Sequence, residues 1–275
     1  MAIAGLSLII ILIAVSIGTI VVDIVDGRNI YNKYVVKQNL ENRLKKPSLD
    51  NIFGIFGCDE FGRSLLFRMI WGTRYSLFVG VMAIAIATIC GGLIGAIAGY
   101  YGGVIDNTLM RIMDVFLAIP SMVLAIAVVA ALGTSMINLL ISIAVPQIPR
   151  FSRIVRASVM SVRDKEFIEA TRSVGAGDFT LITEYILPNA LAPIIVQATL
   201  GTANAILAIA GLSYLGLGIQ PPIPEWGAIL TSAKMYMRDA WHISVIPGLG
   251  IMITILALNL FGDGLRDALD PKLKK

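Results

Sequence analysis

One stretch of the sequence comes close to a known phosphate-binding pattern. Residues 57–64 read GCDEFGRS, or G-x-x-x-x-G-R-S, and the P-loop of nucleotide hydrolases is G-x-x-x-x-G-K-[ST]. A P-loop needs a lysine on the β- and γ-phosphates, a strand before it and a helix after it. Here Arg63 replaces the lysine, residues 51–53 are too short for a strand, and the chain lacks alternating strands and helices. We therefore predict no nucleotide binding, and expect a turn leading into an amphipathic helix.

Other catalytic and metal-binding patterns are also missing from the sequence. Cys58, Cys90 and the single histidine, His242, do not have the spacing of metal ligands. There is no H-E-x-x-H, no acidic pair inside an apolar run and no G-x-S-x-G with partner residues. We predict that the chain is not an enzyme and that it binds no cofactor or metal itself. Trp241 and His242 are interpreted as residues at a membrane interface.

The composition indicates a membrane protein. Of the 275 residues, 57% are hydrophobic and 15% are charged, with a mean hydropathy of +0.82, whereas a soluble domain has about 25% charged residues. The net charge of +4 is a modest surplus that suits lipid head groups. It is not the dense basic surface that nucleic acid requires.

Uncharged apolar runs predict an all-α polytopic protein with six transmembrane helices. We expect a first transmembrane helix in 1–22, an external loop with an amphipathic helix in 23–75, and a five-helix core in 76–275. The fourth run is the weakest, because it is short and contains two prolines, so it is also compatible with a re-entrant segment. The runs lie at 2–22, 76–98, 115–133, 135–149, 190–215 and 244–262.

The residues in and around these runs bear on packing, orientation and energy source. Gly91, Gly95 and Gly99 recur every four residues, which predicts a face where another helix packs closely. Pro120 is expected to kink the third helix. No ionisable residue lies inside any run, which argues against proton-coupled transport. Basic residues divide evenly between the two sides, but the arginines just after the fourth run favour that side as cytoplasmic.

The polar segment 150–189 predicts a short helix, a turn and a second helix. Asp164 suits the N-cap of the first helix, Gly175 its end after Val174, and Asp178 the cap of the second, which Pro188 limits. Two interpretations remain at this point: a helix that docks into a groove on a partner protein, or a solvated loop. The apolar residues that the first helix would present are Phe167, Ile168, Ala170, Thr171 and Val174.

The same segment resembles a known motif. EATRSVG followed by YILPN is similar to the EAA loop of permease subunits in binding-protein-dependent ABC importers, and Thr171 stands where that motif has its second alanine. GCDEFGRS resembles the family's G-T-D-x-x-G-R-D, with Cys58 and Ser64 as departures. Three further stretches are similar to the second, C-type subunit of dipeptide and oligopeptide permeases. They are GYYGGVIDNTLMRIMD, GLSYLGLGIQPPIPEWG and NLFGDGLRDALDP. The resemblance covers 57–275.

This resemblance implies a type I ABC importer permease in a bacterial or archaeal cell (inner) membrane. The implied partners are a second permease, two ATPase subunits that carry ATP and Mg²⁺, and an extracellular or periplasmic solute-binding protein. Short peptides are the implied solute. The implied ATPase-docking residues are Arg163, Phe167, Glu169, Ala170, Thr171, Arg172 and Gly175. We expect an external gate or binding-protein platform at Gln220, Pro221, Pro222 and Trp226.

Two alternatives to a peptide importer stay open from the sequence. Nickel permeases share these motifs, so a nickel or metal-chelate importer of the same family is one alternative. A self-contained secondary carrier or channel is the other, although the absence of charge in the apolar runs argues against it.

Overall fold

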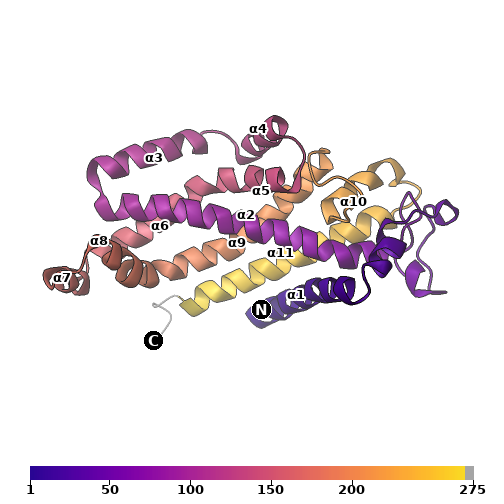
Figure 1. Cartoon of the computed structure of the whole chain (residues 1–275), viewed down its shortest axis with the longest axis horizontal. Helices are drawn as coiled ribbons and strands as arrows, with labels where there is room; N and C mark the ends of the chain where they lie inside the picture. Colours follow the sequence, from indigo (N-terminus) through magenta and orange to yellow (C-terminus); the bar gives the residue numbers. More distant parts are fainter. Residues whose placement is uncertain (270–275) are drawn as a thin grey trace.

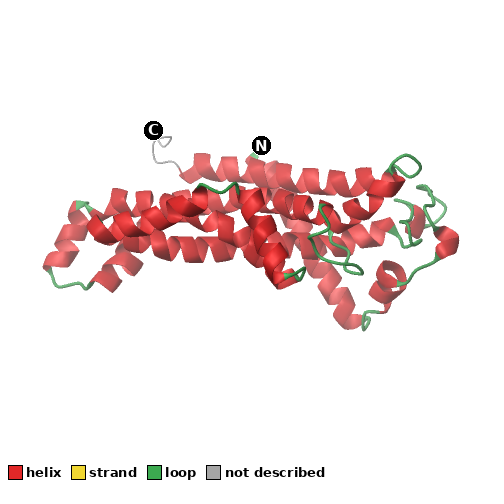
Figure 2. Ribbon diagram, turned by 90° about the horizontal axis from the view of Figure 1, so that it is seen from above, coloured by secondary structure: helices red, strands yellow, loops and turns green. Residues whose placement is uncertain are grey.

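The computed structural model describes residues 1–269, which form an elongated helical bundle (Figures 1 and 2). The described residues contain α-helices, 3₁₀ and π turns, and no strand. The α-helices are α1 (Ala2–Val25), α2 (Leu65–Tyr101), α3 (Gly103–Leu117), α4 (Ser121–Leu132), α5 (Met136–Ala144), α6 (Ile148–Arg163), α7 (Glu166–Ser173), α8 (Asp178–Thr180), α9 (Leu187–Tyr214), α10 (Trp226–Ser232) and α11 (His242–Leu269). The 3₁₀ turns are Leu40–Asn42, Ile52–Gly54, Val145–Gln147 and Ala233–Tyr236, and the π turns are Tyr31–Val36 and Leu181–Ile186.

Four helices are long and apolar enough to cross a membrane, or five if the bent pair α3 and α4 is one span. The four are α1, α2, Asp178–Tyr214 and α11. Six spans were expected. The difference arises at 135–149, which is divided between the nine-residue α5, a 3₁₀ turn at Pro146 and the start of α6.

Two prolines have effects that differ from those expected. At Pro120 the chain does not merely kink, because α3 ends before it, α4 begins after it, and the two helices meet at 85°. Pro188 does not limit its helix, since the chain is helical from Asp178 to Tyr214. Proline has no backbone N–H, and its ring clashes with the preceding turn of a helix. The π turn that ends two residues before Pro188 is wider than an α-helical turn and makes room for the ring.

The GCDEFGRS stretch is a closed turn, and the predicted amphipathic helix after it is the first part of α2. Gly57 and Gly62 have positive φ angles of 75° and 72°. One carboxylate oxygen of Asp59 accepts hydrogen bonds from the backbone N–H groups of Phe61 and Arg63, both at 2.9 Å, and the other accepts from Arg63 Nε at 2.6 Å. Arg63 and Arg68 are both buried with Asp59. A carboxylate therefore fills the centre of this turn, where a P-loop would hold phosphate.

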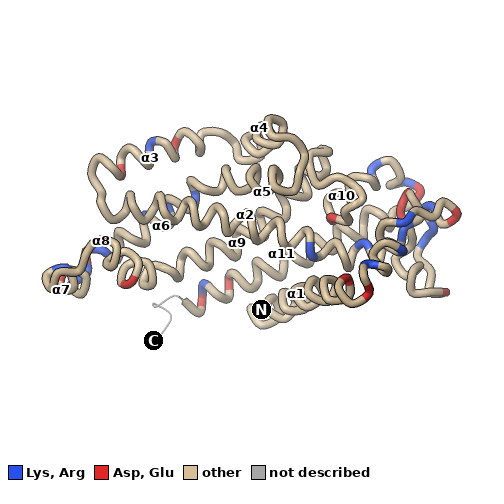
Figure 3. Tube along the Cα trace, in the orientation of Figure 1, with Lys and Arg blue, Asp and Glu red and all other residues tan. Residues whose placement is uncertain are grey.

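The helices arrange the loops into two groups at opposite ends of the bundle (Figure 1). The α6–α7–α8 segment lies at one end, and residues 26–64 and 215–241 form the loops at the other, which we name the outer end and the outer loops. Charged residues gather around α7 and within residues 26–74 (Figure 3). The start of α1 and the end of α11 both point toward the α7 end (Figure 1).

The glycine face of α2 packs against α6, as predicted. A Cβ atom at Gly91 would lie 2.6 Å from Ile148 O, and one at Gly99 would lie 2.8 Å from Arg156 O. At Gly95 it would overlap Ser152 O. Three successive turns of α2 therefore touch the backbone of α6. Only glycine allows the two backbones to come this close, because any side chain would collide with α6.

We expect Gly95→Ala to lower the free energy of unfolding by about 1–3 kcal/mol, because the added methyl group forces the two helices apart. The matched control is Gly92→Ala, where an added Cβ meets no atom within 4 Å; there alanine should be neutral or slightly stabilising. Unfolding of the purified protein in one detergent measures both. Equal stability of the two variants would show that the close approach is dispensable.

Candidate functional site

The α7 end of the bundle is built on the end of α2. Arg163, the last residue of α6, donates from Nη1 to Gly99 O at 2.7 Å and Tyr100 O at 3.3 Å. These carbonyls belong to the last turn of α2, where helical partners are missing. Arg163 Nε also donates to Asp164 Oδ1 at 3.0 Å. Arg163, predicted to contact an ATPase, is thus committed to fixing α6 against α2.

The end of α7 is at the predicted residue, whereas its N-cap is not. The predicted stop at Gly175 is confirmed: its φ is 94°, its N–H donates to Arg172 O, and the next N–H donates to Thr171 O. This pair of bonds is a Schellman ending, which favours glycine. The predicted N-cap is wrong, because Lys165 occupies that position while Asp164 pairs with Arg163.

One face of α7 anchors it and another is exposed. Ile168, predicted to be presented outward, is fully buried among Val159, Val162 and Leu181. The exposed apolar residues, here named the coupling surface, are Phe167, Ala170, Val174 and Phe179. Phe167 is 41% exposed and Val174 is 85% exposed, and 167, 170 and 174 share one helix face. Apolar side chains gathered on one exposed face are typical of an interaction surface.

The remaining predicted docking residues are divided between this surface and the bundle. Glu169 is exposed. Thr171 is half-buried and its hydroxyl donates to Phe167 O at 2.7 Å. The Arg172 guanidinium lies 5.9 Å from the centre of the Tyr100 ring, which ties α7 to α2. Asp178 does not cap a helix as predicted, because its carboxylate accepts a hydrogen bond from the Tyr100 hydroxyl at 2.6 Å.

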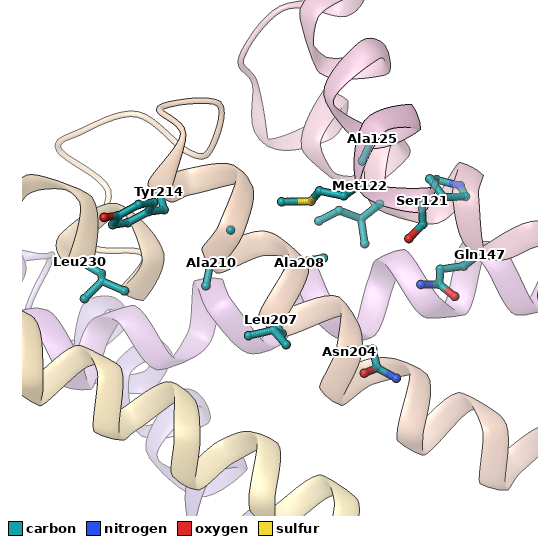
Figure 4. Close-up of a pocket in the computed structure, with 13 residues that line it drawn as sticks. Ser121, Met122, Ala125, Gln147, Asn204, Leu207, Ala208, Ala210, Tyr214 and Leu230 are labelled. Atoms are coloured by element: carbon teal, nitrogen blue, oxygen red, sulfur yellow. The ribbon is translucent and has the colours of Figure 1, made fainter. Parts of the chain in front are cut away.

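A cavity of about 530 Å³ opens between α4, the 3₁₀ turn at Pro146, α9 and α10. Its lining is mostly apolar, but Ser121, Gln147 and Asn204 gather at one end (Figure 4). Tyr214 and Leu230 lie at the other end, near the loops of the outer group. A volume of this size holds a small solute, and a few polar groups on an apolar wall are typical of ligand sites.

A second cavity, of about 490 Å³, continues toward the α7 end. It shares Ser121, Pro146 and Gln147 with the first, and adds Gln197 on α9 and both Arg150 and Arg153 on α6. We name the two cavities together the groove. The α3–α4 break at Pro120 also lines it, so both interrupted helices border the groove.

The predicted gate residues do not lie together. Gln220, Pro221 and Pro222 are exposed at the end opposite α7. Trp226, expected with them at the gate, is 2% exposed and donates from Nε1 to Met69 O at 2.9 Å. His242 is also buried, with its ring Nε2 3.2 Å from Cys58 O. These two aromatic side chains fill the core because each finds a backbone carbonyl partner there.

A buried carboxylate holds the base of this outer loop. Glu225 accepts hydrogen bonds from the N–H groups of Gly227 and Ala228, both at 2.7 Å, which caps α10. It also accepts from Ser76 of α2 at 3.2 Å and Ser213 of α9 at 2.9 Å. Burial raises the pKa of Glu225 above the usual carboxyl value, although these hydrogen bonds oppose the change. The loop 215–224 is therefore attached to three helices at a single side chain.

The groove was not predicted from the sequence, because the apolar runs contain no charged group and Gln147 and Asn204 are neutral amides. Amide residues inside apolar runs were the available signal. Sequence also missed Glu225, whose partners lie 12 and 149 residues away along the chain.

Comparison with known proteins identifies the family. The family described as "binding-protein-dependent transport system inner membrane component" matches residues 91–275. A dipeptide transport system permease protein of Alkalihalophilus pseudofirmus is 50% identical over 236 residues, which cover 86% of this chain and 77% of that protein. A glutathione transport system permease protein of Pectobacterium atrosepticum is 45% identical over 218 residues, covering 79% and 72%.

Solved structures agree on the fold. A chain of the MetNI methionine ABC transporter in an inward-facing conformation has a TM-score of 0.60 at 19% identity, covering 75% of this chain and 98% of that one. An amino acid ABC transporter has a TM-score of 0.57 at 16% identity, covering 74% and 95%. The chain therefore belongs to the inner-membrane permease subunits of binding-protein-dependent ABC importers, as a multi-pass transport subunit and not an enzyme.

Proposed function

We propose that this chain forms half of the pathway of an ATP-driven importer for short peptides. The single observation that carries the solute class is the similarity to dipeptide and di/tripeptide permeases at 49–50% identity. The groove supports it, because neutral amide side chains pair with peptide main-chain groups without selecting a particular side chain. A second permease would supply the other wall.

The coupling surface is proposed to dock on an ATPase subunit. Its apolar side chains would enter a groove on that subunit, in the way that short amphipathic helices bind partners. Glu169, exposed beside them, would pair with a basic group at the rim. ATP and Mg²⁺ would be bound by the two ATPase subunits, and their closure would push α7.

The exposed tip of the outer loop is proposed to meet the solute-binding protein. Gln220, Pro221 and Pro222 form this tip, and prolines restrict the backbone freedom that a flexible loop would lose on docking. Trp226 belongs to the rigid base of the loop. It would support the gate and not touch solute.

We expect Phe167→Asp to reduce the ATPase subunit that copurifies with the tagged chain by about tenfold or more, because a buried apolar contact is replaced by a charge. Glu169→Arg should have a smaller effect. The second permease should still copurify. The control is Leu49→Asp, since Leu49 is 91% exposed at the opposite end. An ATPase yield unchanged by Phe167→Asp would contradict docking at α7.

Uptake by the complete importer in liposomes distinguishes the solutes. We expect a labelled dipeptide to accumulate only when ATP and the binding protein are both present. Nickel uptake without peptide uptake would favour the metal importer. Transport by this chain without ATPase subunits would favour a self-contained carrier.

We expect the double variant Pro221→Ala, Pro222→Ala to lower peptide uptake several-fold and to weaken the stimulation of ATP hydrolysis by the binding protein. The reason is that a more flexible tip loses more conformational freedom on docking. Pro47→Ala, at an exposed proline of the other outer loop, is the control. Uptake at the wild-type level in the double variant would remove the tip from the mechanism.

A further inference from the structure

Arg150 is the one arginine of α6 that has no ion pair among residues 1–269. Arg153 pairs with Asp114 of α3 at 2.5 Å, Arg156 with Asp106 through Nη2 at 2.6 Å, and Arg163 with Asp164 at 3.0 Å. Arg150 is exposed and lines the groove. A guanidinium that has no ion pair and lies in the wall of a permease's cavity is available to bind an anionic group of the solute.

The position of Arg150 follows from the two faces of α6. Phe151, Ser152 and Val155 face α2, where the glycines admit them. Gln147, Arg150 and Ile154 recur at intervals of three and four residues on the other side and line the groove. The close packing of α6 on α2 therefore turns one amide and two guanidinium groups toward the same cavity, and of the two guanidinium groups that of Arg153 is already paired with Asp114.

The amides extend this polar track along the groove. Gln147 lies where the two cavities meet, and Asn204 and Gln197 lie two turns apart on one face of α9. The Asn204 side-chain nitrogen donates to Leu200 O, which leaves its carbonyl oxygen for a solute donor. The first cavity thus presents Asn204 and Gln147, and the second presents Gln147 again with Gln197 and the guanidinium groups of Arg150 and Arg153.

We propose that Arg150 binds the terminal carboxylate of the peptide on its way through the groove. This inference rests on the proposed peptide function. Every unmodified peptide carries one carboxylate whatever its side chains are, and guanidinium groups bind carboxylates through paired, charge-assisted hydrogen bonds. Gln147 and Asn204 bind the main-chain amides behind it. Because Arg150 is exposed, the site holds the peptide transiently and releases it toward the α7 end.

Photolabelling of the purified importer in nanodiscs, without the binding protein, tests the site. The probes are a dipeptide carrying a photoreactive side chain and the same dipeptide with a C-terminal amide. We expect the free acid to label the groove about tenfold more than the amide in the wild type. Arg150→Gln should reduce labelling by the acid to the level of the amide, and Arg150→Lys should retain part of it.

Arg153→Gln is the matched control, because Arg153 lines the same cavity one turn away but is already bound to Asp114. It should leave the preference for the acid unchanged. Equal labelling of the wild type by acid and amide, or an Arg150→Gln variant that still prefers the acid, would overturn the assignment. Loss of the second permease from the Arg150→Gln complex would also overturn it, by making Arg150 an interface residue.

Uptake by the wild-type importer separates this inference from the function on which it rests. If no peptide accumulates with ATP and the binding protein, the peptide function fails. If peptide accumulates but acid and amide label the groove equally, only the carboxylate site fails.

Discussion

The backbone contact between α2 and α6 is the constraint on which the rest of the molecule depends. Gly91, Gly95 and Gly99 let the two helices meet without intervening side chains, and in a membrane such close packing replaces the hydrophobic effect as the source of helix association. The contact continues to the end of α2, where Arg163 satisfies its terminal carbonyls. Once α6 is fixed in this way, the position of everything attached to it is fixed as well.

Both candidate functional surfaces are attached to α6. Its C-terminus leads directly into α7, which Ile168 anchors in the same apolar cluster as Val159. Its outward face borders the groove through Gln147 and Arg150. Under the proposed function, a force applied to the coupling surface would reach the groove through α6 and the Pro146 turn that precedes it. The interrupted backbone at Pro120 and Pro146 lies where the groove would have to change shape, and broken helices in membranes occur where a cavity or protein surrounds them.

The polar side chains of the bundle form two sets, those with hydrogen-bond or ion-pair partners in the protein and those that border open space. At the outer end, Asp59, Glu225 and their partners form buried sets of hydrogen bonds and ion pairs that hold loops rigidly. Along the groove, Gln147 and Arg150 border open space. A buried polar group without a partner is costly. In a stable bundle such groups therefore have protein partners, except where they contact a solute or water. This difference separates the structural acid at Glu225 from the groove residues, although all of them are polar residues close to membrane-spanning helices.

The sequence by itself determined the class of the protein, the apolar helices, the glycine face of α2, the Gly175 stop and the family. These follow from composition, local periodicity or contiguous motifs, which act over a few residues. The tertiary structure alone decided that Ile168, Trp226 and His242 are buried, that Arg163 caps α2, and that Pro120 breaks its helix while Pro188 does not. It also brought Gln147, Arg150 and Asn204 to one groove. The physical reason is that burial and pairing depend on which faces of distant helices meet, and a local pattern specifies a face but not the partner that covers it.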